Sequence, residues 1–447
     1  MNTFKTSRRK FLGRSSSLAV GLPLAAAIPS AIEKVASPTK VEAASADDIR
    51  QPIPNRTLPS LAIGSQRTTV SGLYTDGKTD CSLIINAAIL SMAQAGGGTV
   101  FIPSQPTPLP NSLPPAQCVY MIDPQANGDG SSVPYHGVTL QSNVRIECAP
   151  GVKLQAITIN TNSSKLTDRA YMFYGGLGSD GNPIHDVEIA NCWLVGERYT
   201  HIYSGISPGT DEHCYGIALY GVKNVNIRAT YISDCTGDGI CIGSLSNASP
   251  SNVTLCDVIS TGNRRQGMSI TAGSSIAAYD SEFSYTAGTA PGDGIDIEPQ
   301  GTDSVSNVTI DNCVIRGNAA NGIELNASKG SVTGVNVVNC LIDYNSYAGF
   351  FAGSANTGTV YGNAFFQNGW YGIHLGGNTE SYIVGGYSSG GYDSNSFANN
   401  GIHNNTNSPI TYPNPTETNT SGVISGNDIN ITSTLPNTIQ WNSYFTS

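Results

Sequence analysis

The stretch "PGDGIDIEPQG", residues 291–301, decides the fold because its pattern recurs along the chain. A glycine followed by an apolar, a variable and an apolar residue appears as GIAL (216–219), GICI (239–242), GMSI (267–270), GIDI (294–297), GIEL (322–325), GFFA (349–352) and GIHL (372–375). The interval is 23 residues from Gly216 to Gly239 and 28 residues from Gly239 to Gly267. An internal repeat of this length indicates stacked structural units.

Each repeat unit contains short strands and no room for a long helix. A second strand pattern lies between the glycines, as NVNI (224–227), NVTL (252–255), NVTI (307–310) and VNVV (335–338). No helix of about 10 residues fits between these strands, which excludes βαβ units, and the turn dipeptides of antiparallel hairpins are missing. A coil of two or three short strands, stacked on the next coil, fits both constraints. We therefore predict an all-β parallel β-helix over residues 136–405, with about ten rungs.

The inward and outward positions of this coil follow from the alternation of each strand. Ile295 and Ile297 are expected to point into the core, and Asp296 and Glu298 outward together. An asparagine stands four residues before the glycine in four repeats, and we expect these side chains to form a hydrogen-bonded ladder: Asn263, Asn318, Asn345 and Asn368.

The segments that flank the coil have distinct compositions. Residues 47–135 are expected to hold the first strands and a helix from Cys81 to Ala95, with Thr79 or Asp80 as N-cap and Gly96 as C-cap. Such a helix would cover the open end of the coil and shield its strand edge. Residues 406–447 are polar and Pro-containing, and "GVISGNDINI" in this tail is interpreted as a last imperfect rung.

The N-terminus resembles a twin-arginine export signal over residues 1–46. Arg8 and Arg9 precede a weakly apolar run that is short and interrupted by Gly21 and Pro23, so it does not read as a membrane span. We expect cleavage near residue 46 and a mature protein that is periplasmic, secreted or on the cell surface, with no stable membrane span after cleavage. An uncleaved anchor or a chance arginine pair is the alternative.

Charge and cysteine content narrow the function class. The net charge is −10 and the pI is about 5.0, which argues against a nucleic-acid partner. The ten cysteines include three that follow strands in the same way, Cys192, Cys313 and Cys340, and no CxxC pair is present. We expect reduced thiols in the core rather than disulfides or a zinc or redox site.

Two further stretches resemble a known family. "GLYTDGKTDCSLIINAAILSMAQAGGGTVFIPS" (72–104) and "GVTLQSNVRIECAPGVKL" (137–154) are similar to the opening segments of the pectate-lyase superfamily of right-handed parallel β-helix proteins. The resemblance extends over about residues 68–400 and implies a right-handed coil with an N-terminal capping helix. The superfamily includes pectate lyases, polygalacturonases, other polysaccharide lyases, epimerases and phage tailspikes, so the fold alone does not select an activity. The polygalacturonase motifs are not intact here, since Gly237-Asp238 stands where an Asp-Asp pair is expected.

Stacking the repeats places several acids together. Asp296 and Glu324 occupy the same position in adjacent repeats, Asp293 and Glu298 flank Asp296, and Asp238 lies two rungs away. Glycoside hydrolysis needs one protonated and one ionised carboxyl group, and adjacent like charges raise the pKa of one member. We therefore predict that Asp296 and Glu324 form a catalytic pair, with Asp293 or Asp238 as further candidates for the second role. The alternative is an ordinary polar turn, because "GDG" is also common turn chemistry.

Other outward residues are candidates for binding a polysaccharide, the expected partner. Arg264 and Arg265 could bind an acidic group of the glycan, and Glu298 lies beside the acids. Trp370, Tyr371 and His374 follow lower on the same face, where aromatic rings could stack on sugars.

Two other functions use the same residues. Asp293, Asp296 and Glu324 could hold Ca²⁺. A calcium ion beside an arginine resembles the lyase sites of this superfamily, where the reaction is an elimination on a uronate. The hydrolase hypothesis needs no cofactor. Candidates for the lyase base are Arg264, Arg265, His213 and Tyr215. The third possibility is a non-catalytic glycan-binding or tailspike-like surface protein. The sequence does not choose between a monomer and a trimer.

Overall fold

Short strands and tight turns account for nearly all of the described residues. The computed structural model describes residues 56–104, 118–130, 133–159, 169–178, 180–203, 211–246, 248–353 and 356–375, together with the strand backbones at 382–384 and 396–398. The expected export signal, the polar tail and most of the coil beyond residue 375 lie outside the described residues. The described residues all belong to one unit, residues 45–447.

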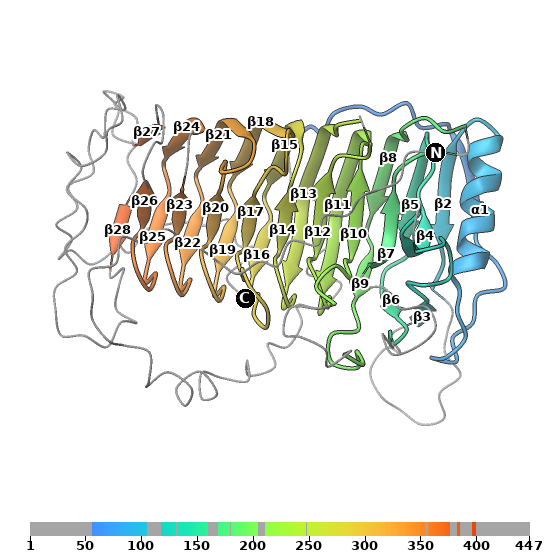
Figure 1. Cartoon of the computed structure of the whole chain (residues 1–447). Coiled ribbons are helices and arrows are strands. Elements are labelled where there is room, and N and C mark those ends of the chain that lie inside the picture. Colours follow the sequence, from blue (N-terminus) through green and yellow to red (C-terminus); the bar gives the residue numbers. More distant parts are fainter. Residues whose placement is uncertain are drawn as a thin grey trace. The chain divides into compact units, whose positions relative to one another are not determined.

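The strands wind into a coil with three strands in most full turns, and all pairings between the named strands are parallel. One turn contains β17 (Ile295–Ile297), β18 (Ser304–Asp311) and β19 (Val314–Arg316), and the next contains β20 (Ile323–Leu325), β21 (Ser331–Val338) and β22 (Leu341–Asp343). Figure 1 shows corresponding strands of successive turns side by side. The predicted parallel β-helix is therefore confirmed.

One sheet contains the strands of the glycine repeat. In spatial order it is formed by β26 (Ile373–Leu375), β23 (Phe350–Ala352), β20, β17, β14 (Met268–Ile270), β12 (Ile240–Gly243), β10 (Ile217–Tyr220), β7 (Ala170–Gly175) and β4 (Tyr135–Thr139). We call it the repeat sheet.

The remaining strands form two strips that join through the long strands β11 (Lys223–Ser233) and β13 (Ser251–Thr261). The first strip also contains β1 (Gln66–Thr69), β2 (Gly98–Ile102), β5 (Val144–Cys148), β8 (His185–Ala190), β15 (Gly273–Tyr279), β18, β21, β24 (Asn356–Tyr361) and β27 (Tyr382–Val384). The second contains β3 (Cys118–Ile122), β6 (Val152–Ala156), β9 (Trp193–Val195), β16 (Glu282–Ser284), β19, β22, β25 (Ala364–Phe366) and β28 (Ser396–Ala398).

Alternation along each strand fills the inside of the coil with apolar side chains. Ile295, Ile297, Ile323 and Leu325 are fully buried in one continuous core, as their alternation predicts. The glycine before each strand is required by close contact between rungs. A Cβ atom on Gly294 would lie 2.7 Å from the carbonyl oxygen of Gly322 on the next rung, closer than van der Waals contact allows.

The asparagine ladder is also present. Asn318 Nδ2 donates to Asn345 Oδ1 at 2.8 Å, and Asn345 Nδ2 donates to Asn368 Oδ1 at 3.0 Å. The oxygens of Asn345 and Asn368 also accept the backbone N–H of the ladder residue on the preceding rung. Asn263 holds the corresponding turn two rungs before Asn318, where its Oδ1 accepts the N–H of Cys235. The ladder satisfies buried backbone groups that a turn leaves without partners.

The ten cysteines are all buried, as expected for residues of the core. Cys313 and Cys340 stack on successive rungs, where the backbone N–H of Cys313 lies 3.4 Å from Cys340 Sγ. The residue before each is an asparagine in the left-handed conformation, with φ of 55° for Asn312 and Asn339. Asparagine tolerates this conformation better than most residues, which explains the recurring Asn-Cys pair.

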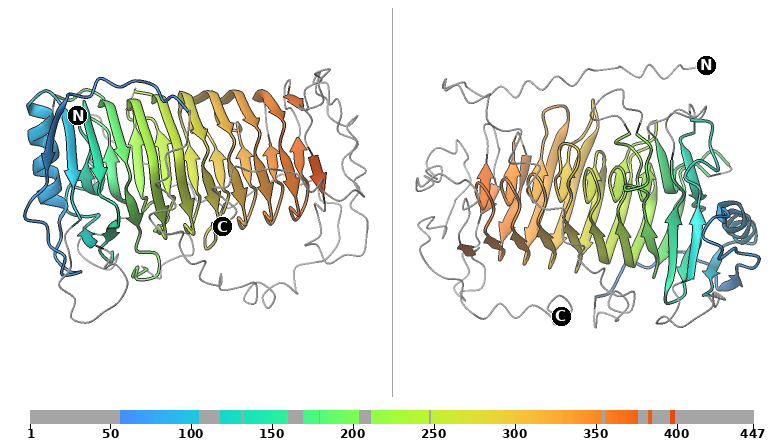
Figure 2. Two further views of the ribbon diagram at one scale, coloured as in Figure 1. Left: turned by 180° about the vertical axis from the view of Figure 1, so that it is seen from behind. Right: turned by 90° about the horizontal axis from the view of Figure 1, so that it is seen from below.

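The predicted helix is α1 (Ser82–Gln94), within one residue of the expected bounds, and it packs at the N-terminal end of the coil (Figures 1 and 2). Ile85, Ile89 and Met92 are its buried apolar residues. The expected caps are shifted, since Cys81 and Ala95 occupy the cap positions. Asp80 acts next to the cap: its Oδ1 accepts the backbone N–H of Ser82 at 2.9 Å. No described helix is long and apolar enough to cross a membrane.

Candidate functional site

The outward side chains of the repeat sheet form a continuous column across the rungs. The register pairs Ser269 with Asp296, Asp296 with Glu324, Glu324 with Phe351, and Phe351 with His374. Asp296 and Glu324 are therefore direct neighbours, with backbones ~4.8 Å apart as in any sheet. The predicted stacking of these two acids is correct.

A second column lies in the turn one residue before each glycine. Backbone hydrogen bonds join its members rung by rung: Gly239 N–H donates to Gln266 O at 2.9 Å, and Gly294 N–H donates to Asn321 O at 3.1 Å. The column runs through Asp238, Gln266, Asp293 and Asn321. We call the two columns together, from Asp238 to Glu324, the acid cluster.

The acid cluster is much less exposed than outward positions of a β-helix usually are. Asp238 and Asp293 have no exposed surface, and Asp296 is 5% exposed. Asp296 lies outside the apolar core that holds Ile295 and Ile297, as expected, but its side chain is enclosed by its own polar neighbours. Glu298 is half-buried at the margin, where its carboxylate lies 3.7 Å from Lys329 Nζ.

Arg265 neutralises one acid of the cluster. Its guanidinium donates to both carboxylate oxygens of Asp238, at 3.1 and 3.0 Å, and Ser269 Oγ donates to the same carboxylate at 2.7 Å. Burial raises the pKa of Asp238, and Arg265 opposes this effect. In this structure the guanidinium of Arg265 therefore pairs with an acid of the protein itself, Asp238.

Asp293, Asp296 and Glu324 form the part of the cluster in which the carboxyl pKa values are raised. Burial raises the pKa of Asp296 to about 8, and the charges of Glu324 and Glu298 add to the effect. Burial also raises the pKa of Asp293 well above its usual range, followed by the charges of Glu324 and Asp296. The pKa of Glu324 is raised by burial as well. Three carboxyl groups this close cannot all ionise at neutral pH.

Neutral amides orient these carboxyl groups. The Gln266 side-chain amide donates to Asp296, and Asn321 Nδ2 donates to Glu324 Oε2 at 2.9 Å. Asn321 N–H donates to Asp293 Oδ1 at 2.7 Å, and Asp293 Oδ2 is buried without a hydrogen-bond partner. The sequence reasoning missed Gln266 and Asn321 as part of the site, although their place one residue before the repeat glycine could have identified them.

Aromatic residues flank the acid cluster on both sides. Toward the C-terminal end, Phe351 and Tyr371 lie with His374, whose ring is 5.0 Å from each of them. Trp370 is 43% exposed and stacks on the equally exposed Tyr347 at 4.7 Å between ring centroids. The Tyr347–Trp370 pair is therefore an exposed aromatic surface beside the column.

The opposite flank is a tyrosine group that the sequence reasoning did not single out as a unit. Tyr171 and Tyr215 stack at 5.2 Å with nearly parallel rings, and Tyr174 and Tyr220 pack against Tyr171. Tyr171, Tyr174 and Tyr215 are each less than 7% exposed. Their positions on consecutive rungs are the signal that could have revealed them.

Arg264 points away from the acid cluster. Its guanidinium lies over the ring of Tyr203 at 4.7 Å and reaches the backbone oxygens of Thr236 and Asp211 at 3.4 and 3.5 Å. His213, one of the proposed bases, lies 4.0 Å from Glu212 and 6.1 Å from the Tyr215 ring. The two consecutive arginines thus contact different parts of the molecule.

Comparisons with known proteins place the chain among β-helix proteins. Over 287 residues it is 29% identical to the uncharacterized protein YclG of Bacillus subtilis, covering 61% of this chain and 44% of that protein. The chain thus spans less than half the length of this relative. Among solved structures, ORF18 of Geobacillus virus E2 is similar with a TM-score of 0.52 at 17% identity, covering 75% of this chain and 59% of that one.

The mannuronan C-5 epimerase AlgE4 A-module of Azotobacter vinelandii is also similar, with a TM-score of 0.47 at 15% identity over 75% of this chain and 95% of that one. The family model described as "Right handed beta helix region" matches residues 136–365, more than half of the chain. The match covers the repeat sheet from β4 to β23 and the acid cluster. The chain belongs to the right-handed β-helix family.

Proposed function

We propose that this protein is a glycoside hydrolase that cleaves a polysaccharide bound along the repeat sheet. The observation that carries the proposal is the stacked pair of Asp296 and Glu324, two carboxyl groups on adjacent rungs in different surroundings. Asp296 is enclosed, whereas Glu324 is half-buried and closer to solvent. Glycoside hydrolysis requires this division into an acid and a base.

In the proposed mechanism, Asp296 is the general acid. With a pKa of about 8 it holds its proton at neutral pH, and Gln266 orients its carboxyl group by hydrogen bonding. The proton passes to the glycosidic oxygen as the bond to the leaving sugar breaks.

Glu324 is the ionised partner in this proposal. Burial raises the pKa of Glu324, and the hydrogen bond that Asn321 donates to its carboxylate opposes this effect and favours the charged form. Because Asp296 and Glu324 are adjacent in register, the pair fits the short carboxyl separation of about 5–5.5 Å of retaining enzymes, in which Glu324 would attack the anomeric carbon. The Tyr347–Trp370 surface would support a sugar ring further along the chain.

Calcium-assisted elimination is the second candidate. The observation that favours it is Asp293 Oδ2, a buried carboxyl oxygen without a hydrogen-bond partner beside Glu324 and Asp296. Carboxylate oxygens are suitable ligands for Ca²⁺. However, Asp293 and Asp296 have raised pKa values, which oppose the ionised form that a calcium ion requires.

The deciding experiment incubates the protein with a panel of neutral and uronate-containing polysaccharides, with and without a calcium chelator. Hydrolysis yields new reducing ends without ultraviolet absorbance from unsaturated uronates, and the chelator has no effect. Unsaturated product that the chelator abolishes would establish the lyase instead. Binding without turnover on any substrate would support a non-catalytic glycan-binding protein.

Matched variants then test the residues. Asp296→Asn and Glu324→Gln should each reduce turnover by at least about 10³-fold without loss of fold, since each removes one of two essential groups. Asp257→Asn is the control, because Asp257 is a half-buried acid, with a pKa raised to about 7, on β13 outside the acid cluster. Full activity in both cluster variants would refute the assignment.

A further inference from the structure

A second group of ionisable side chains lies apart from the acid cluster. Glu197 and His201 belong to the segment after β9, and Asp211 and Cys214 belong to the segment before β10. All four residues are buried, with at most 7% of their surface exposed. The group is polar and charged, which is costly in a buried position unless its members are mutually satisfied.

The hydrogen bonds of Glu197 fix the tautomer of His201. His201 Nδ1 lies 2.7 Å from Glu197 Oε2, and the Thr236 hydroxyl donates to Glu197 Oε1 at 2.7 Å. Glu197 therefore accepts at both oxygens, and Nδ1 carries the proton that it accepts. In the neutral imidazole this leaves the lone pair on Nε2.

That lone pair has no partner. His201 Nε2 is buried and makes no hydrogen bond, and it lies 3.5 Å from Asp211 Oδ2. In that tautomer the Nε2 lone pair faces a carboxylate oxygen in a buried position, which is unfavourable unless a cation lies between them. A spacing of 3.5 Å is too long for a good hydrogen bond and is close to the separation of two ligands bound to one small metal ion.

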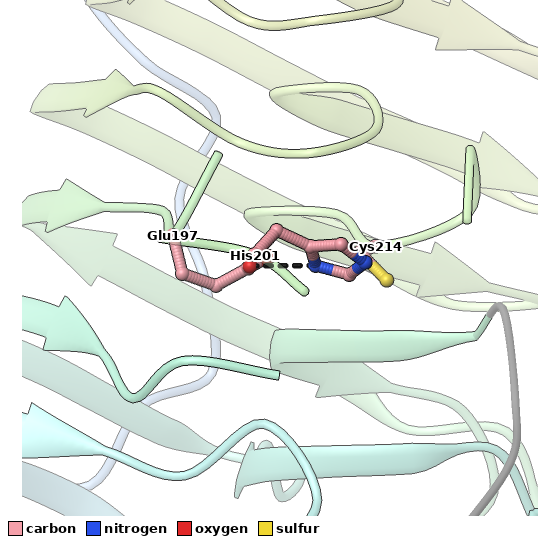
Figure 3. Close-up of side chains that lie close together, drawn as sticks. All are labelled: Glu197, His201 and Cys214. Carbon is pink, nitrogen blue, oxygen red and sulfur yellow. Dashed lines mark hydrogen bonds and ion pairs between the residues drawn. The ribbon is translucent and has the colours of Figure 1, made fainter. Parts of the chain in front are cut away.

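Cys214 supplies a third potential ligand. One ligand atom each from Glu197, His201 and Cys214 lies within 4.8 Å of the other two. Figure 3 shows the His201 ring with one edge toward the Glu197 carboxylate and the opposite edge toward Cys214. The ring is therefore held by its carboxylate as in metal sites where a second carboxylate orients a ligating histidine.

We propose that this group is a zinc site in which His201 Nε2, Asp211 and Cys214 bind the ion, Glu197 orients His201 and the fourth coordination position is left open. A thiolate and a carboxylate carry two negative charges, which balance Zn²⁺ without other groups. The thiol and imidazole favour zinc over Ca²⁺ and Mg²⁺, which prefer oxygen ligands. The Cys214 proton is released to solvent on binding, so affinity falls as the pH is lowered.

The position of the site indicates what the ion would do. It would join the segment after β9 to the segment before β10, and Glu197 would extend the link to Thr236. Arg264 spans the same region through the backbone oxygens of Asp211 and Thr236. The zinc ion would thus fix the turns beside the tyrosine group, independently of the chemistry proposed at Asp296 and Glu324.

The test measures metal in the full chain, purified without chelator and dialysed against Zn²⁺. We expect about one zinc per chain by mass spectrometry of the metal, and a lower Tm after chelation that added Zn²⁺ restores. The Co²⁺-loaded protein should show a thiolate charge-transfer band that Cys214→Ser abolishes. His201→Gln should reduce metal content, whereas Cys256→Ser and His185→Gln, at residues outside the group, should bind as the wild type does.

Two results would overturn the proposal whether or not these variants fold. One is a wild-type protein that binds no zinc above the level of the buffer blank. The other is a zinc-treated wild type in which nuclear magnetic resonance finds His201 as an imidazolium held between Glu197 and Asp211. Glu197→Gln provides a milder variant, since glutamine can still accept the Nδ1 proton; it should keep the zinc but bind it about 10–100-fold more weakly.

Discussion

Replacing Asp296 by asparagine should stabilise the protein, and the gain in stability should be larger at pH 8 than at pH 5. Asp296 is enclosed beside Glu324 and Glu298, so the folded state disfavours its ionised form. The amide has nearly the same shape as a protonated carboxyl group and can still accept the Gln266 hydrogen bond. The substitution therefore removes the titratable group and leaves the packing around it unchanged.

The sign and size of this change in stability follow from the raised pKa of Asp296. An unfolded aspartate titrates near 3.9, whereas folded Asp296 titrates at about 8. Between these values the folded state holds a proton that the unfolded state has lost, so the free energy of unfolding falls as the pH rises, and it levels off above pH 8. The slope from this group is roughly 1.4 kcal/mol per pH unit, or about 4 kcal/mol between pH 5 and pH 8.

The assay is urea unfolding of wild type and Asp296→Asn, followed by circular dichroism at pH 5, 6.5 and 8. The stability difference between the two proteins should grow with pH and favour the variant. Asp76→Asn is the control: hydrogen bonds from Thr79 and Lys78 lower the pKa of Asp76 to about 2, so its effect on stability should not change between pH 5 and pH 8. A difference that is constant from pH 5 to pH 8 would show that Asp296 does not hold its proton in the folded protein.

Three further predictions address the ladder, the ion pair and the aromatic surface. Asn345→Leu should lower the free energy of unfolding, measured with urea, by about 2–5 kcal/mol. The reason is that a buried backbone N–H and a buried carbonyl lose their partners. A loss below about 0.5 kcal/mol would contradict the ladder's role. Arg265→Met should lower the free energy of unfolding by about 3–5 kcal/mol, because Asp238 is left charged and buried. Adding Asp238→Asn should restore most of this loss. Additive effects of the two substitutions would argue against a coupled pair. Trp370→Ala should lower the free energy of unfolding by less than about 1.5 kcal/mol. It should raise KM for the polysaccharide that the protein cleaves, with little change in kcat. An unchanged KM would exclude the Tyr347–Trp370 surface as a subsite.

The repeat made the fold and one part of the site predictable. Because rungs stack in strict register, the spacing of Gly294 and Gly322 is enough to place Asp296 beside Glu324. The same argument places Asn318 on Asn345. These features depend on the period of the chain and on local sterics, both of which are visible in a linear sequence.

The solvent exposure of the acids could not be derived in this way. Alternation says that Asp296 does not point into the apolar core, but whether water reaches it depends on how Gln266 and Glu324 pack around it. The partner of a charged side chain is undetermined for the same reason. Arg264 and Arg265 are consecutive in the chain, yet one contacts Tyr203 and the other binds Asp238.

The sequence by itself therefore determined the coil, its core and the register of its outward columns, since each follows from a repeating local pattern. Only the tertiary structure decided which acids are buried, which arginine neutralises Asp238, and that His201 meets Asp211 and Cys214. Those outcomes depend on the paths of irregular turns and on competition among side chains for partners. Neither has a period in the sequence, so neither can be read from spacing alone.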